Sequence, residues 1–111
     1  MRRFVLYLTA TVAIGTTPVA ALPHAFLNQA EPPVGGMVPA SPKEIRLTFS
    51  EAIEPSFSGI DLAAGDGRII ATGPAFVDPG NNNQLVLALP QLVPGRYRVR
   101  WHVVSVDTHR T

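Results

Sequence analysis

The chain has 111 residues, which is enough for one domain but not for two. It contains no cysteine, so disulfide bonds are excluded, and its formal net charge of +1 lacks the basic surplus typical of nucleic-acid binding. Even this small surplus comes from the first residues, because the chain from His24 onward carries seven Lys and Arg against eight Asp and Glu.

The N-terminal segment has the order of parts found in secretory signal peptides. Two arginines at positions 2 and 3 precede an apolar stretch at 4–15, and small residues follow at 19–21. The apolar stretch is shorter than the about 20 residues that span a bilayer. We therefore predict a signal peptide at 1–23 and an exported domain at 24–111 that does not insert into the membrane. A retained N-terminal membrane anchor is the alternative interpretation.

The exported part shows the two-residue alternation of β-strands, and no segment has a helical period. Residues 31–42 form an extended, turn-rich opening, and turns are predicted at 65–67, 80–83 and 94–95. Strands are predicted at 44–50, 57–62, 68–72, 84–89 and 96–105. This pattern favours an all-β fold, an antiparallel Greek-key β-sandwich, with an open sheet or a small barrel as alternatives.

The last predicted strand has the clearest alternation. Tyr97, Val99 and Trp101 share one face, which we assign to the core. The arginines at 98 and 100 share the other face with His102, so His102 is interpreted as a surface residue.

The other two histidines of the exported part lie at its two ends. His109 follows Asp107 by two residues, and in an extended segment these side chains point the same way. A histidine at a mature N-terminus, here His24, offers a ring nitrogen and an α-amine whose ordinary pKa is about 8. Three nitrogens and one oxygen suit a tetragonal Cu(II) ion. A solvated loop acid beside a surface histidine is the ordinary alternative for Asp107 and His109. A hydrolytic triad of Ser105 with Asp107 and His109 is disfavoured, because these residues lie within five positions of one another and a triad needs its base between the nucleophile and the acid in space.

Three segments together resemble the copper resistance protein CopC family, and the resemblance covers the whole exported part. The segments are His24-Ala25-Phe26-Leu27 followed by Pro32 and Pro33, then Leu47-Thr48-Phe49-Ser50-Glu51, and then Pro94-Gly95-Arg96-Tyr97 with Trp101-His102-Val103-Val104-Ser105-Val106-Asp107-Thr108-His109.

The resemblance implies a periplasmic, cupredoxin-like or immunoglobulin-like sandwich that binds one Cu(II) ion in copper resistance or homeostasis. Carried over by position, the metal ligands are His24, Asp107 and His109, and Glu51 orients a ligand from outside the coordination sphere. Trp101 is expected beneath the site. The resemblance also implies delivery of copper to an inner-membrane partner of the CopD type. A solvated acid at a strand end is the alternative for Glu51.

The sequence departs from the family pattern in three ways. It lacks the methionine-rich loop with which some members bind Cu(I), so a site for Cu(II) only is expected. Cleavage directly before His24 would leave Pro23 at the last position of the leader, which does not match the small residue preferred there. Cleavage after Ala21 matches this preference better, and the α-amine would then lie on Leu22 and not on His24. Family members continue into a final strand beyond the position of Thr111, so a C-terminal strand is expected to be missing.

Three functions remain open on the sequence. The first is a copper carrier or buffer that binds Cu(II) without turnover and is not an enzyme. The second is a copper-dependent oxidative enzyme in which His24 and either His102 or His109 form a histidine brace. The third is a metal-free sandwich that acts as an interaction module.

Overall fold

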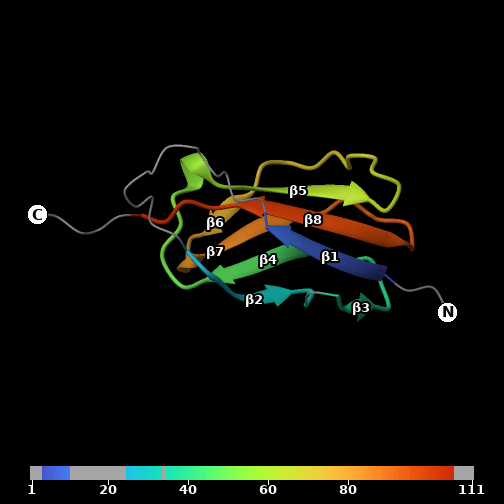
Figure 1. Cartoon of the computed structure of the whole chain (residues 1–111), viewed down its shortest axis with the longest axis horizontal. Coiled ribbons are helices and arrows are strands. Elements are labelled where there is room, and N and C mark those ends of the chain that lie inside the picture. The colour runs from blue at the N-terminus through green and yellow to red at the C-terminus, as the bar shows by residue number, and fades with distance from the viewer. Residues whose placement is uncertain (1–3, 11–24, 34, 107–111) are drawn as a thin grey trace, which may run out of the picture.

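The computed structural model describes residues 4–10, 25–33 and 35–106, which form two facing four-stranded sheets (Figure 1). The β8 sheet has the order β3-β1-β8-β5, and the β4 sheet has the order β2-β4-β7-β6. In chain order the elements are β1 (Phe4–Ala10), β2 (Leu27–Glu31), β3 (Met37–Val38), β4 (Glu44–Phe49), the short 3-10 helix η1 (Pro55–Phe57), β5 (Gly59–Ala64), β6 (Phe76–Asp78), β7 (Asn81–Ala88) and β8 (Arg96–His102).

The predicted antiparallel sandwich is confirmed. Consecutive strands β4 and β5 lie in different sheets, as do β7 and β8, so the chain crosses repeatedly between the layers. All strand pairs of the described residues are antiparallel except β1 and β8, which run parallel. The parallel pair involves a segment that the sequence assigns to the leader.

The core lies between the sheets and follows the predicted alternation. In β4, every second residue is buried. Its neighbour β7 adds buried residues from the same sheet, and β5 and β8 supply buried residues from the facing sheet. The buried cluster consists of Ile45, Leu47, Phe49, Ile53, Ile60, Leu62, Leu85, Leu87, Leu92, Tyr97 and Val99. The Tyr97 hydroxyl is satisfied inside the core because it donates a hydrogen bond to the Val93 carbonyl just before β8 begins. Burial of this apolar surface is the main term that stabilises the sandwich.

Several predicted boundaries are wrong, each for a local reason. Residues 68–72 form no strand, since only a bridge between Ile69 and Ala63 and two backbone bonds hold this segment to β5. Position 57, predicted as the start of a strand, belongs to η1, because the Glu54 side chain accepts the Ser56 N–H and begins a tight turn there. Alternation did not reveal β2 and β6, which are short edge strands with mostly polar or exposed residues.

A polar network covers the outer face of the β4 sheet. The Arg46 guanidinium donates to Glu44 Oε2 at 2.9 Å and to Gln84 Oε1 at 2.7 Å, and it forms an ion pair with Asp78. The Gly80 N–H donates to the other oxygen of Asp78 at 2.8 Å. Hydrogen bonds to the charged carboxylate hold the pKa of Asp78 below its usual value. The bond from Gly80 has the larger effect, and the bond from Arg46 the next largest.

This lowered pKa predicts a loss of stability in acid. Because folding favours the ionised carboxylate, the contribution of Asp78 is complete above its unfolded pKa of about 4 and disappears as the pH falls through the lower folded value. Urea unfolding measured between pH 2.5 and 6 should show a smaller fall in stability below pH 4 for Asp78→Asn than for the unchanged chain. Identical pH dependence in both proteins would contradict the assignment.

Candidate metal centre

The three predicted ligands, His24, Asp107 and His109, lie outside the described residues. Within residues 4–10, 25–33 and 35–106, the acidic and histidine side chains form no group of three that could hold a metal ion. The structure does describe the chain directly after His24 and directly before Asp107. It therefore shows where Phe26 and Val106, which lie near the predicted ligands in the chain, attach to the sandwich.

The N-terminal end is attached to the residue that follows β4. The Phe26 N–H donates to Ser50 Oγ at 2.9 Å, and the Ser50 N–H donates to the Phe26 carbonyl at 2.8 Å. One residue further, Leu27 pairs in register with Phe49, the last residue of β4. These contacts fix the backbone two residues after His24.

The C-terminal end is attached two residues further along the same segment. The Val106 N–H donates to the Ala52 carbonyl at 2.8 Å, and Ser105 pairs with Ile53 in an isolated antiparallel bridge. The Glu54 N–H also donates to the Val104 carbonyl at 2.8 Å. The backbone is thus fixed at the residue directly before Asp107.

Glu51 lies between these two attachments. Its neighbours Ser50 and Ala52 hold the Phe26 and Val106 ends respectively, and its own side chain is exposed. In the sequence, only the resemblance to the CopC family pointed to Glu51. The structure places Glu51 between the residue bonded to Phe26 and the residue bonded to Val106.

The segment that holds both ends is itself braced by other strands. The Ile53 N–H donates to the Asn82 carbonyl at 2.9 Å, and Asn83 Nδ2 donates to the Phe49 carbonyl at 3.3 Å. Both asparagines belong to β7, so the centre of the β4 sheet supports this segment. The turn predicted at 80–83 is wrong, because β7 begins at Asn81. The role of the two asparagines was not predicted, because hydrogen bonds to a distant part of the backbone leave no periodic signal in the sequence.

Ser58 braces the C-terminal end in a second way. Its hydroxyl accepts the Val104 N–H at 3.0 Å and donates to the Glu54 carbonyl at 2.7 Å. The Ser105 hydroxyl, in contrast, is buried and has no hydrogen-bond partner in the described part of the chain. Neither serine was predicted to have a role.

His102 lies where the alternation placed it, exposed on the outer face of β8. It pairs in register with Gly59, and a Cβ at Gly59 would lie 2.8 Å from His102 Cε1. The imidazole therefore lies over the glycine, which leaves room for it. Trp101, on the opposite face, is half-buried against the core.

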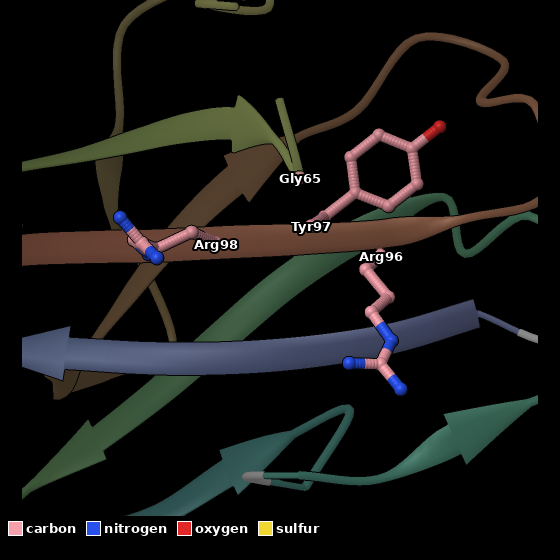
Figure 2. A pocket seen from close by; sticks show the side chains of 4 residues that line it. All are labelled: Gly65, Arg96, Tyr97 and Arg98. Atoms are coloured by element: carbon pink, nitrogen blue, oxygen red, sulfur yellow. The ribbon is translucent and has the colours of Figure 1, made fainter. Parts of the chain in front are cut away.

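A hollow of about 320 Å³ lies at the other end of β8 and is lined by Gly65, Arg96, Tyr97 and Arg98 (Figure 2). It flanks the first residues of β8, whereas the ends of the exported part attach beyond its last residue. The hollow is therefore separate from the residues that attach Phe26 and Val106. In the described residues, no helix is both long enough and apolar enough to cross a membrane.

Two proteins of Escherichia coli are similar to nearly the whole of this chain. Protein YobA of Escherichia coli (strain K12) is 36% identical over 110 residues, which is 98% of this chain and 89% of the relative. The copper resistance protein C of Escherichia coli is 34% identical over 109 residues, which is 92% of this chain and 85% of that protein.

Two solved structures share the fold. The crystal structure of CopC from Methylosinus trichosporium OB3b superimposes with a TM-score of 0.71 at 34% identity, covering 78% of this chain and 83% of that one. PcoC, a methionine-rich copper resistance protein from Escherichia coli, gives a TM-score of 0.62 at 29% identity, covering 78% of this chain and 89% of that one. The family model described as the CopC domain matches residues 27–111, and the chain therefore belongs to the CopC family.

Proposed function

We propose that this protein is an exported, periplasmic copper-binding protein that holds one Cu(II) ion between the two ends of its mature chain. The ligands are the His24 imidazole, the Asp107 carboxylate and the His109 imidazole, and the cargo is bound and released without turnover. Glu51 orients a ligand through a hydrogen bond from outside the coordination sphere.

The attachment of both ends on either side of Glu51 carries this proposal. Phe26 and Val106 are bonded to Ser50 and Ala52, so His24 begins two residues from one fixed point and Asp107 one residue from the other. A fully extended residue spans about 3.3–3.6 Å, so short arms connect each ligand to its fixed point. Two short arms that start from neighbouring points can reach a common ion.

The donor chemistry supports Cu(II). Imidazole and carboxylate donors suit Cu(II), whereas thiolates and thioethers suit Cu(I). The sequence has no cysteine, and Met37 is the one methionine after the initiator. This composition contrasts with that of the relative PcoC, which is described as methionine-rich.

The names of the relatives support a role in copper resistance or homeostasis. Three are named copper resistance protein C. Another, named copper transport protein CutJ of Bacillus subtilis (strain 168), matches over 93 residues that make up 17% of its length. A partner in the inner membrane, of the CopD type, is the proposed receiver of the copper. Delivery to this partner would explain why the ion is held at the ends of the chain and not inside the sandwich.

Cu(II) titration of the exported protein tests the function. The fluorescence of Trp101, the single tryptophan, is the readout, and the expected result is quenching that saturates at one Cu(II) per chain. Electron paramagnetic resonance of the loaded protein should show a tetragonal centre with nitrogen ligands. A protein that purifies without copper and does not bind added Cu(II) would instead be a metal-free module. Oxidative turnover by the loaded protein would favour the histidine-brace enzyme.

The intact mass of the exported protein defines the ligand count. A mature chain that begins at His24 would supply the α-amine as a fourth donor, whereas cleavage after Ala21 would leave three side-chain donors and a vacant position for water. The two forms should also differ in pH dependence, because only a ligating amine, with an ordinary pKa of about 8, must lose a proton on binding.

Ser50 gives a test of the attachment. Ser50→Ala removes the hydroxyl that accepts the Phe26 N–H and should loosen the arm that leads to His24. By analogy with residues that orient metal ligands, we expect Cu(II) affinity to fall by about tenfold. Ser56→Ala, an exposed serine in η1, is the control and should bind as the unchanged protein does. Equal affinities in both variants would show that the attachment does not position His24.

A further inference from the structure

Ser105 is a buried polar residue whose hydroxyl the sandwich does not use. Its side chain belongs to a residue that is 3% exposed, and no group within residues 4–10, 25–33 and 35–106 forms a hydrogen bond with its Oγ. Buried hydroxyls in proteins are nearly always bonded, because an unbonded hydroxyl loses its hydrogen bonds to water without a replacement. Packing of the two sheets alone therefore does not explain a serine at this position.

The surroundings of Ser105 would suit an apolar residue. Its partner in the isolated bridge is Ile53, which is 2% exposed and belongs to the buried cluster. The nearby Ser58 is different, because its hydroxyl accepts the Val104 N–H at 3.0 Å and donates to the Glu54 carbonyl at 2.7 Å. Ser58 thus stabilises the fold through its hydroxyl, whereas alanine would fill the position of Ser105 equally well.

The core-facing row of β8 continues past the end of the strand and includes Ser105. Its members alternate along the chain and are buried or partly buried, whereas Val106 is 39% exposed. The row consists of Tyr97, Val99, Trp101, Val103 and Ser105. Two residues further along the sequence is Asp107, a proposed copper ligand that lies outside the described residues. Continued alternation predicts that its side chain starts on the same side of the chain as that of Ser105.

The Ser105 hydroxyl lies within reach of the proposed ligand. The Val106 N–H donates to the Ala52 carbonyl at 2.8 Å and so fixes the chain between the two residues. In an extended segment, Cα atoms two residues apart are separated by about 6.6 Å, and a serine and an aspartate side chain can bridge this gap. A carboxylate that binds a metal through one oxygen keeps the other as an acceptor, and ligating carboxylates are themselves hydrogen-bonded.

We propose that Ser105 is a positioning residue for the copper site, whose hydroxyl donates a hydrogen bond to the Asp107 oxygen that does not bind the ion. This inference rests on the proposed function. Without copper the buried hydroxyl lacks a partner and lowers the stability of the fold, and the bound carboxylate supplies that partner. The serine therefore has opposite effects on the two states, because it destabilises the empty protein and strengthens the loaded one.

Ser105→Ala tests both effects in the exported protein. Cu(II) affinity, measured by competition with a chelator, should fall by about tenfold, as for other residues that orient metal ligands. Urea unfolding of the metal-free protein should show an unchanged or higher midpoint, because the variant removes an unbonded hydroxyl. A residue with a purely structural hydrogen bond would lower this midpoint.

Ser58→Ala is the matched control for the unfolding measurement. It leaves the Val104 N–H and the Glu54 carbonyl without their partner, so its metal-free midpoint should fall. A second pair of variants separates the hydroxyl from the size of the side chain. Ser105→Thr keeps the hydroxyl and Ser105→Val has the same shape without it, so the first should bind Cu(II) about tenfold more tightly than the second.

A double-mutant cycle tests whether Ser105 acts through Asp107. In a protein that carries Asp107→Ala, the acceptor is absent, so adding Ser105→Ala should change Cu(II) affinity by less than about twofold. A full tenfold loss in that background would show that the hydroxyl acts on another group, and the proposal would be wrong.

Two further results would overturn the inference. If Ser105→Ala lowers the metal-free midpoint as much as Ser58→Ala does, the hydroxyl has a partner in the absence of copper. If Ser105→Ala binds Cu(II) as tightly as the unchanged protein while His109→Ala does not, the inference fails and the proposed function stands. An unchanged protein that does not bind Cu(II) would overturn both.

Discussion

Replacement of His24 or His109 by alanine is expected to abolish tight Cu(II) binding. Each change removes an imidazole from a small ligand set. Changing a residue outside the coordination sphere lowers metal affinity by about 10–100-fold, and the loss of Cu(II) affinity here should be larger. Competition titration against a chelator, followed by Trp101 fluorescence, measures the affinity. Asp107→Asn should weaken binding as well, because it removes the only anionic ligand.

His102→Ala is the matched control for these changes. His102 is exposed on the arginine-bearing face of β8 and lies over Gly59, so its removal should leave Cu(II) affinity unchanged. If His102→Ala abolishes binding and His109→Ala does not, the ion is bound on the face of β8 and the ends of the chain are not its ligands.

Phe49→Ala is expected to cause the largest loss of fold stability. Phe49 is 1% exposed at the end of β4 and belongs to the cluster between the two sheets. Truncation of a buried phenylalanine to alanine costs about 3–5 kcal/mol, a large part of the stability of a small domain. Urea unfolding of the exported protein, followed by Trp101 fluorescence, measures this loss.

Phe57→Ala provides the comparison, because Phe57 is 67% exposed in η1 and its removal should change the free energy of unfolding by less than about 0.5 kcal/mol. Phe49→Ala should also weaken copper binding, since Ser50 and Glu51 follow Phe49 directly. A protein that tolerates Phe49→Ala as well as Phe57→Ala would show that the two sheets do not pack as described.

The sequence predicted the strands whose two faces meet different surroundings. In β4 and β8, alternate residues face the core and the solvent, so the pattern has a period of two and the burial follows it. In β7 the pattern was less informative because Leu85, Val86 and Leu87 are all buried. The edge strands β2 and β6 bury few side chains, so their pairing comes from backbone bonds that composition does not reveal.

The candidate metal centre was harder to predict from the sequence than the strands. Its ligands could be proposed because histidine and aspartate have specific metal chemistry, and they remain a prediction. The residues that fix the ends of the exported part, Ser50, Ala52 and Ser58, act through backbone amides and carbonyls or through a single hydroxyl. Contacts of this kind join positions far apart in the chain, and only the fold shows which positions meet.

The placement of both attachments outside the hydrophobic core has a consequence for how cargo would leave. Phe26 and Val106 are held by a few hydrogen bonds at the rim of the sandwich, so either arm can fray while the packed layers stay intact. Unloading would then need only the opening of one arm, at a cost far below that of global unfolding. A protein built in this way could bind an ion tightly and still release it to a receiver that displaces only one terminal segment.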